Sequence, residues 1–331
     1  MKYLLKKCGH QELGSMNASS MQPQRGQYLL MAMQDAVLSF FPALSTTRQN
    51  DFCLVPLHPL YSNEIVYCRF VYHNDRFHGS TAAHPRNEYR LYLNLEVQGG
   101  QRRFFEEGIV VLRMVNENDY ESGLYLDYSS PEDGKYSKYN QILNENNTGR
   151  LGNYAVYDGV IEEFEKLVCE NIISPQVVSV PEEEIHFLEE RSDNLETLFT
   201  DRMFRDFVSV AYKHKCAITG MVIGNDAFNN LETAHIRPKA HRGPFLPCNG
   251  LMLCRDFHWA FDHGFLALTD DLKVMVSKNA PSSMLVPYDG KKIYIPEEPF
   301  FRPKLEYVQY HREHIFEHFE SIRSRNGEEN L

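Results

Sequence analysis

Short stretches in the first half of the chain alternate between apolar and polar residues. Leu93, Leu95 and Val97, for example, are separated by Asn94 and Glu96. Side chains along a strand point to opposite faces in turn, so this pattern predicts half-buried strands. A continuous apolar run predicts a more deeply buried strand. We predict strands at residues 64–72, 89–97, 109–115 and 124–128, with a turn at 98–101.

Other stretches have apolar residues three or four positions apart, which predicts amphipathic helices. Leu30, Met33, Val37 and Phe41 show this spacing, whereas residues 1–24 are polar, show no pattern and are expected to be loose. We predict helices at residues 27–41, 160–169, 194–212, 255–262 and 306–322. Strands of the second half are predicted at 231–236, 249–253, 265–268, 273–276 and 292–295.

These elements predict an α+β chain whose 331 residues have room for about two domains. Several strands and one early helix predict an N-terminal mixed β-rich domain at residues 1–175. Residues 176–194 are rich in acidic residues and contain prolines, which favours an acidic linker. The C-terminal domain is predicted at residues 195–331.

The formal net charge of −11 argues against a general nucleic-acid binder, because duplex binding depends on cations that replace counterions. The charge is uneven, since residues 213–263 hold six Lys or Arg, four Asp or Glu and five histidines. We therefore expect a locally basic site within an acidic protein. No apolar run is long enough to cross a bilayer, and we expect no signal peptide. Seven scattered cysteines favour reduced thiols and a cytoplasmic location.

The most informative segment contains two histidines and an Asn-Gly pair in a fixed order. His235 closes an apolar strand, Asn249 and Gly250 form a turn, and His258 lies on a short helix. Metal-assisted cleavage of a phosphodiester needs a base for water, a rigid loop and a metal ligand that faces the base. The segment offers one residue for each of these roles.

The segment resembles HNH endonucleases, whose fold is called ββα-metal, and specifically the subgroup common in restriction-like proteins. His235, Asn249 and His258 stand where the family has its H, N and H, at spacings of 14 and 9 residues. The resemblance covers roughly residues 195–320. It implies an α+β protein whose N-terminal β-rich domain is followed by a ββα-metal HNH nuclease domain, and in which the N-terminal domain serves DNA recognition or sensing.

The resemblance implies a role for each residue of the segment. His235 is expected to be the general base and His258 a metal ligand, with Asn249 tying the loop and Gly250 supplying backbone freedom. Asp262 lies four residues after His258 on the same helical face and is either a second ligand or a residue that pins the helix end. Ala234 stands where many members have another ligand, and Glu232 is the candidate to replace it. A carboxylate favours Mg²⁺ or Mn²⁺, whereas imidazole also suits Zn²⁺ and Ni²⁺.

Basic residues around the segment are the candidates for contacts with DNA phosphates. These are Arg237, Lys239, Arg242 and Arg255. The alternative is a solvated basic loop. A four-cysteine zinc site is not expected, because Thr219 takes the place of a second cysteine after Cys216, and Cys248 and Cys254 are too far apart in sequence.

Two segments outside the motif each allow two interpretations. Residues 123–157 are rich in Tyr and Asn, which either contact bases or pack against a sheet edge. The acidic run at 182–190 is either a solvated helix face or a shield over the basic site until DNA displaces it.

The sequence thus predicts a metal-dependent endonuclease that cuts double-stranded DNA, as a restriction or anti-phage defence enzyme of the cytoplasm. A palindromic target would require a homodimer, since two-fold symmetry in DNA is matched by two-fold symmetry in protein. Two alternatives are a nuclease activated by a ligand or partner without sequence specificity, and a catalytically silent DNA-binding module.

Overall fold

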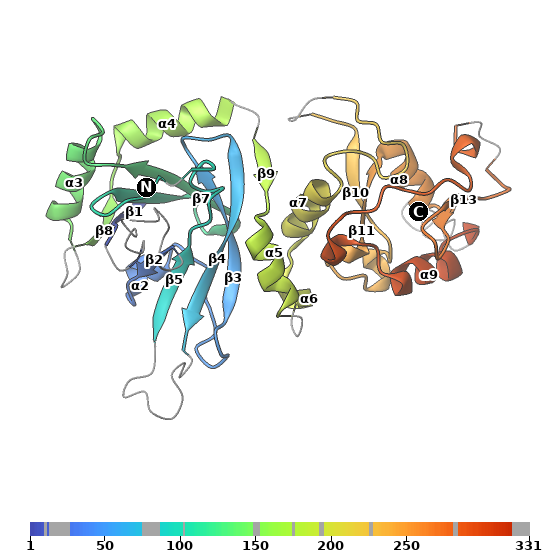
Figure 1. Ribbon diagram of the computed structural model, residues 1–331, viewed down its shortest axis with the longest axis horizontal. Coiled ribbons are helices and arrows are strands. Elements are labelled where there is room, and N and C mark those ends of the chain that lie inside the picture. Colours follow the sequence, from blue (N-terminus) through green and yellow to red (C-terminus); the bar gives the residue numbers. More distant parts are fainter. Residues whose placement is uncertain are drawn as a thin grey trace, which may run out of the picture. The chain divides into compact units, whose positions relative to one another are not determined.

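The computed structural model describes residues 1–9, 12, 27–74, 87–101, 103–147, 153–173, 176–191, 195–224, 228–280 and 284–319. Contacts between residues divide the chain into two compact units, Met1–His186 and Phe187–Leu331. The chain is a mixed α+β protein (Figure 1). No helix in the described ranges is long and apolar enough to cross a membrane.

One curled mixed sheet forms the frame of the first unit (Figure 1). Among the described residues nine strands join it, in the order β2-β5-β4-β3-β7-β6-β1-β8, with β9 paired to β4. Two pairings, β3 with β7 and β4 with β9, are parallel, and the others are antiparallel. The strands are β1 (Lys2–Lys7), β2 (Tyr28–Met31), β3 (Phe52–Pro59), β4 (Glu64–His73), β5 (Glu88–Tyr92), β6 (Ile109–Asn116), β7 (Asp119–Ser129), β8 (Tyr154–Asp158) and β9 (Val177–Ser179).

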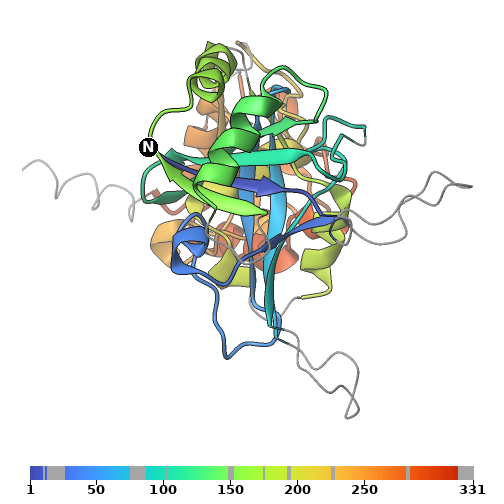
Figure 2. The same cartoon turned by 90° about the vertical axis from the view of Figure 1, so that its left-hand side faces the viewer.

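The sheet is buried on both faces at β6 and β1, the two strands that precede the edge strand β8 in the order. Alternate residues of β1 enter different cores, Leu4 on one side and Tyr3 and Leu5 on the other. Helices α3 (Tyr136–Glu145) and α4 (Glu162–Ile173) cover the second face (Figure 2). Short α2 (Asp35–Leu38) packs Val37 into the first core. This double coverage explains why the strands read as almost continuous apolar runs.

Three predictions for the first unit are wrong. Residues 27–41 form β2 and α2 instead of one helix, because Leu29 and Met31 are buried while Leu30 is exposed, a period of two. The N-terminal segment expected to be loose holds strand β1, which pairs with β6 on one side and β8 on the other; residues 10, 11 and 13–26 lie outside the described ranges. Strand β5 ends at Tyr92, and Leu95 is exposed in the turn that follows.

The strands predicted at 64–72, 109–115 and 124–128 and the helix predicted at 160–169 are confirmed as β4, β6, β7 and α4. Tyrosines of the segment 123–157 pack in the cores: Tyr125, Tyr128 and Tyr139 are buried. For these three, the packing interpretation holds.

The segment expected as an acidic linker contains β9 and helix α5 (Glu182–Glu189), and the boundary between the units falls within this helix. Glu184 is fully buried, with Oε2 2.5 Å from Nε of Arg69 on β4. Burial outweighs the attraction of Arg69 and raises the pKa of Glu184 to about 8. The interpretation of residues 182–190 as a solvated helix face is therefore wrong for Glu184.

The second unit is built around a β-hairpin followed directly by a helix. Strands β10 (Leu231–His235) and β11 (Gly250–Cys254) are antiparallel, and α8 (Arg255–Asp262) begins where β11 ends. Helix α7 (Asp201–Ala211) contacts both strands of the hairpin. The remaining elements are α6 (Leu195–Leu198), β12 (Leu266–Leu268), β13 (Val274–Val276), α9 (Leu305–His314) and the short 3₁₀ helices η3 (Lys239–His241), η4 (Pro247–Asn249), η5 (Val286–Tyr288) and η6 (Pro299–Phe301).

The predicted strands and helix of the motif are confirmed, while three neighbouring elements differ. The helix predicted at 194–212 is divided into α6 and α7, because Thr200 begins a new helix by accepting a hydrogen bond from the Met203 N–H. Residues 292–295 contribute an isolated bridge between Lys273 and Lys292 instead of a strand. Helix α9 ends at His314, short of the predicted end at 322, which lies outside the described ranges.

Candidate active site

The hairpin and α8 bring the three motif residues of the sequence into one small region. His235 is the last residue of β10 and pairs with Gly250, the first of β11. Asn249 precedes that strand, and His258 lies one turn into α8. Local order along the chain is therefore enough to assemble a ββα unit around these residues.

Asn249 fastens the two ends of the loop between the strands. Its side chain is fully buried, and its Oδ1 accepts a hydrogen bond from the Arg237 N–H at 2.8 Å. Its Nδ2 donates to the carbonyl oxygens of Arg237 at 3.1 Å and Pro244 at 3.0 Å. Every hydrogen bond goes to backbone, so this side chain shapes the loop that follows His235.

Position 250 requires glycine because there is no room for a side chain. The role predicted from the sequence, backbone freedom, is therefore wrong. Its φ of −118° and ψ of 147° are ordinary extended values. A Cβ at this position would lie 2.4 Å from Cγ2 of Val208 and 2.9 Å from Cε2 of Phe204. The glycine therefore allows α7 to approach the hairpin closely.

The ring of His235 lies between two aromatic side chains. It stacks on Phe204 with centroids 4.2 Å apart and meets Phe245 edge-on at 5.5 Å. Its Nε2 is buried and has no hydrogen-bond partner within the described residues. Burial lowers the pKa of His235 below the usual imidazole value. The charges of Lys239 and His258 also lower this pKa, whereas those of Asp201 and Asp262 raise it without reversing the shift.

His258 lies between two carboxylates. Its Nδ1 is 2.9 Å from Oε2 of Glu232 in hydrogen-bond geometry, and its Nε2 is 3.2 Å from Oδ2 of Asp262. Burial alone would lower the pKa of His258, but Asp262 and Glu232 outweigh it and raise the pKa. Glu232 also accepts a hydrogen bond at Oε1 from Nε of Arg255 at 3.0 Å.

The pair of His258 and Asp262 fits a hard divalent cation. Adjacent ligand atoms of an octahedral cation with bonds of ~2.1 Å lie roughly 3 Å apart, close to the 3.2 Å between Nε2 and Oδ2. Ala234 is fully buried and offers no ligand atom. Within the ranges described above, no three His, Cys, Asp or Glu side chains converge on one point that could hold a metal, either at this site or at another. A cation held by these two side chains would have its remaining positions open to water and phosphate.

The four basic residues predicted to bind phosphate differ in how far they are already engaged. Arg255 is held by Glu232, and Arg237 donates to the His241 carbonyl and stacks on Tyr310. Lys239 lies over the ring of Phe245, 5.0 Å from its centroid, and is exposed. Arg242 is exposed in a left-handed backbone conformation with φ of 59°. Arg255 is also exposed, with 69% of its side chain accessible, so Lys239 and Arg242 differ from it in not being held by a carboxylate among the described residues.

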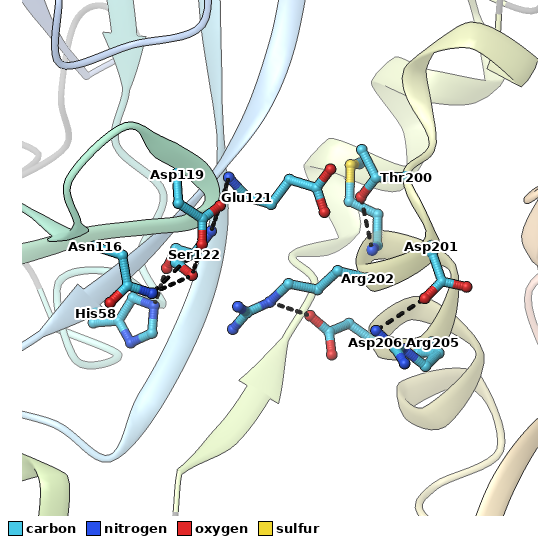
Figure 3. Close-up of polar contacts among 11 residues, drawn as sticks. His58, Asn116, Asp119, Glu121, Ser122, Thr200, Asp201, Arg202, Arg205 and Asp206 are labelled. Carbon is cyan, nitrogen blue, oxygen red and sulfur yellow. Dashed lines mark hydrogen bonds and ion pairs between the residues drawn. The ribbon is translucent and has the colours of Figure 1, made fainter.

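A cleft of about 540 Å³ opens beside His258 and Glu232. Its lining also includes Arg205 and Ser209 of α7, together with His214 and Thr233. Figure 3 shows two ion pairs on α7, Arg205 with Asp201 and Arg202 with Asp206. Asp201 is also one of the charges that act on His235.

The apolar stripe of α7, from which the helix was predicted, does not indicate that its polar side lines this cleft. Acid–base pairs four positions apart were the available signal for its polar side. The aromatic contacts of Phe204 and Phe245 with His235 had no comparable sequence signal, because they depend on tertiary packing.

The cysteines of this unit are free thiols. Cys216, Cys248 and Cys254 are buried, and Sγ of Cys254 lies 3.5 Å from the Thr219 hydroxyl. Burial raises the pKa of Cys248 to about 11, which keeps its thiol protonated at neutral pH.

Comparison with known proteins agrees with this geometry. Residues 216–269 match the model of a family described as HNH endonuclease. No curated protein matches the chain. A modification dependent TagI restriction endonuclease is similar in structure, with 16% identity over 95% of this chain and 75% of that chain and a TM-score of 0.28. The N-terminal domain of Helicobacter pylori LlaJI.R1 has 13% identity over 48% of this chain and 100% of that chain, also with a TM-score of 0.28.

TM-scores this low carry no argument about function, so the family match and the motif geometry decide the assignment. The chain carries an HNH endonuclease domain, which the family model places at residues 216–269.

Proposed function

We propose that the chain is a metal-dependent endonuclease that hydrolyses phosphodiester bonds of double-stranded DNA in restriction or anti-phage defence. The observation that supports this most strongly is the environment of His235. Burial lowers the pKa of its imidazole, Phe204 and Phe245 contact the ring, and the charges of both His258 and Asp262 act on it. A neutral base close to a cation-binding pair is the arrangement that hydrolysis requires.

His235 would accept a proton at Nδ1 from a water placed in line with the scissile phosphate. The oxygen of that water bonds to phosphorus while the bond from phosphorus to the 3′ oxygen breaks. This leaves a 5′-phosphate and a 3′ oxyanion, which takes a proton from solvent water to become a 3′-hydroxyl. Phe204 and Phe245 hold the ring in place, and Asn249 holds the loop that follows it. His235 and Asn249 thus have separate roles, one in proton transfer and one in geometry.

His258, through Nε2, and Asp262 would hold the cation, for which Mg²⁺ or Mn²⁺ is the best match to a nitrogen and a carboxylate oxygen. When bound, a divalent cation stabilises negative charge on the phosphate and on the leaving oxygen. Asp262 serves here as a ligand rather than as a residue that only pins the helix end. The 3.2 Å between Nε2 and its carboxylate supports that choice.

The DNA backbone would follow the cleft between α7 and the hairpin. Arg205 supplies exposed positive charge in this cleft, and Lys239 and Arg242 supply it on the loop that follows His235. Acidic Asp206 and Glu232 also line the cleft, but each is already paired with a cation, Arg202 and Arg255 respectively. Arg237 is a weaker candidate, because its guanidinium is already engaged by His241 and Tyr310.

The first unit would provide selectivity for sequence or base modification, as the recognition or sensor domain expected at residues 1–175. A cytoplasmic enzyme of this kind would meet invading DNA directly. Cleavage of a palindromic site would proceed as a homodimer.

The direct test is cleavage of plasmid and of modified and unmodified phage DNA in Mg²⁺, in Mn²⁺ and with a chelator. The proposal predicts metal-dependent cleavage, with 5′-phosphate ends, and a preference for one DNA type that reveals the selectivity. Binding to DNA without cleavage under any divalent ion would overturn it in favour of a silent binding module.

A further inference from the structure

Glu232 uses both of its carboxylate oxygens within the protein. Oε1 accepts a hydrogen bond from Nε of Arg255 at 3.0 Å, and Oε2 lies 2.9 Å from Nδ1 of His258. Arg255 is the first residue of α8, and Glu232 lies on the neighbouring strand β10. The carboxylate therefore connects the strand that carries His235 to the helix that carries His258.

Glu232 and Asp262 contact different nitrogens of the same imidazole. Glu232 lies at Nδ1 and Asp262 at Nε2. The lone pairs of the two ring nitrogens point to different edges of the ring, so a cation bound through one nitrogen has only the carboxylate on that edge beside it. This explains why these three side chains do not converge on a single metal position.

Two observations place the cation at the Nε2 edge. The contact of Nδ1 with Glu232 has hydrogen-bond geometry, which suits an N–H at Nδ1 and leaves the lone pair of Nε2 for a metal. On the Nε2 edge, Oδ2 of Asp262 lies 3.2 Å from Nε2, so a cation bound there has a carboxylate oxygen beside it. A histidine that binds a metal commonly donates its other N–H to a carboxylate in this manner.

We infer that Glu232 is a positioning residue that fixes the tautomer and orientation of His258, and that Arg255 holds Glu232 in place. This inference rests on the proposed function, because it concerns the same cation site. It removes Glu232 from the ligands expected from the sequence. It also changes the expected role of Arg255 from phosphate contact to support of the site.

Binding of Mn²⁺ alone to the full chain, measured by titration calorimetry, separates a positioning residue from a ligand. Glu232→Ala removes the acceptor for Nδ1–H and should weaken Mn²⁺ binding by about 10- to 100-fold. Glu232→Gln keeps a carbonyl oxygen that can accept this hydrogen bond and should retain most of the affinity. Asp262→Asn provides the comparison, because an amide is a poor replacement for a charged ligand and should not rescue binding.

Two matched arginines extend the test. Arg255→Ala should weaken Mn²⁺ binding, although less than Glu232→Ala does. Arg202→Ala, on α7 and paired with Asp206, should leave Mn²⁺ affinity unchanged. The inference is overturned if Glu232→Gln loses as much affinity as Glu232→Ala, which marks a ligand, or if neither substitution changes it.

The tautomer of His258 provides a readout that needs no metal. Long-range ¹H–¹⁵N spectra of the metal-free protein, recorded at a pH high enough that the imidazole carries a single proton and with the His258 signals assigned by comparison with His258→Ala, should show that proton on Nδ1 in the wild type and in Glu232→Gln. Glu232→Ala should lose this preference. A wild-type proton on Nε2 would contradict the inference. If the wild type binds Mn²⁺ and has the expected tautomer but cuts no DNA, the proposed function is contradicted while the role of Glu232 stands.

Discussion

The side-chain oxygen of Asn249 accepts a hydrogen bond from the backbone N–H of Arg237 over 2.8 Å, across the loop that joins the two strands of the hairpin. The same side chain donates to the carbonyls of Arg237 and Pro244. One buried amide thus satisfies three backbone groups that strand pairing does not satisfy. The position of His235, two residues before Arg237, depends on this connection.

Asn249→Ala should destabilise the second unit by about 2–5 kcal/mol, because buried backbone groups that lose a partner cost about 1–3 kcal/mol each. Asn249→Asp should not restore stability, since a carboxylate cannot donate to the two carbonyls. Trp259, the single tryptophan of the chain, lies in this unit and reports its unfolding by fluorescence in denaturant. Exposed Asn279→Ala is the control, and equal effects of Asn279→Ala and Asn249→Ala would refute the structural role.

On the acid limb of the pH–rate profile, the cleavage rate should decline at a pH below the usual imidazole pKa of about 6.5. A base works only when unprotonated, and burial between Phe204 and Phe245 lowers the pKa of His235. The rate should therefore persist as pH falls through that value and decline only at lower pH. Saturating metal is required in this measurement, so that a proton on His258, whose pKa is raised by Asp262 and Glu232, does not limit the rate.

Phe245→Ala should shift this limb toward higher pH, because it exposes the His235 ring to water. The charges that face His235, namely Asp201, Asp262, Lys239 and His258, are unchanged in this variant. A wild-type limb at or above pH 6.5, or no shift in Phe245→Ala, would count against His235 as the titrating base.

Arg205→Ala should reduce the salt dependence of DNA binding by about one unit of slope, the effect of losing one phosphate contact. Arg202→Ala is the matched control on the same helix, since each arginine is paired with an aspartate four positions away and only Arg205 lines the cleft. Binding is measured by fluorescence anisotropy without metal, so that no DNA is cut. The same slope in Arg205→Ala and wild type would place the DNA elsewhere.

His311 should make the second unit less stable as the pH falls. It is buried and stacked on Phe261, and its Nε2 lies 3.1 Å from the Phe261 carbonyl oxygen. Burial lowers the pKa of His311 to about 4. Between that value and about 6.5 the unfolded chain binds more protons than the folded chain. The free energy of unfolding therefore decreases as the pH is lowered, by about 3 kcal/mol over the whole interval.

His311→Gln keeps an N–H donor but cannot titrate. The pH dependence of denaturant unfolding, followed by Trp259 fluorescence, should therefore be shallower in His311→Gln than in the wild type between pH 6.5 and 4.5. Identical slopes in the two proteins would show that His311 is protonated without cost in the folded state.

The sequence allowed the hairpin, α8 and the three motif residues to be predicted because these elements are local. Leu231–His235 and Arg255–Asp262 were predicted to within one residue, and the partners of Asn249 lie within 12 positions of it. Short-range order of this kind is set by patterning, turns and strand pairing.

Features that depend on distant packing could not be predicted in this way. The helical spacing of Leu30, Met33 and Val37 was misleading, because pairing of β2 with β5 overrides local preference. The need for glycine at position 250 arises from Val208 and Phe204 on α7, about 40 residues earlier, and no turn pattern reveals it. The separation of Glu232 from Asp262 by the ring of His258 likewise requires three-dimensional geometry.

The most direct test of the account is the single-turnover rate of plasmid cleavage by wild type and His235→Ala at saturating Mg²⁺ or Mn²⁺, with DNA affinity and folding of both proteins checked in parallel. We expect the substitution to lower the rate by about 10²- to 10⁴-fold, the usual contribution of a general base, while DNA affinity is retained. Equal rates for the two folded proteins would contradict the assignment of His235 and the mechanism that depends on it.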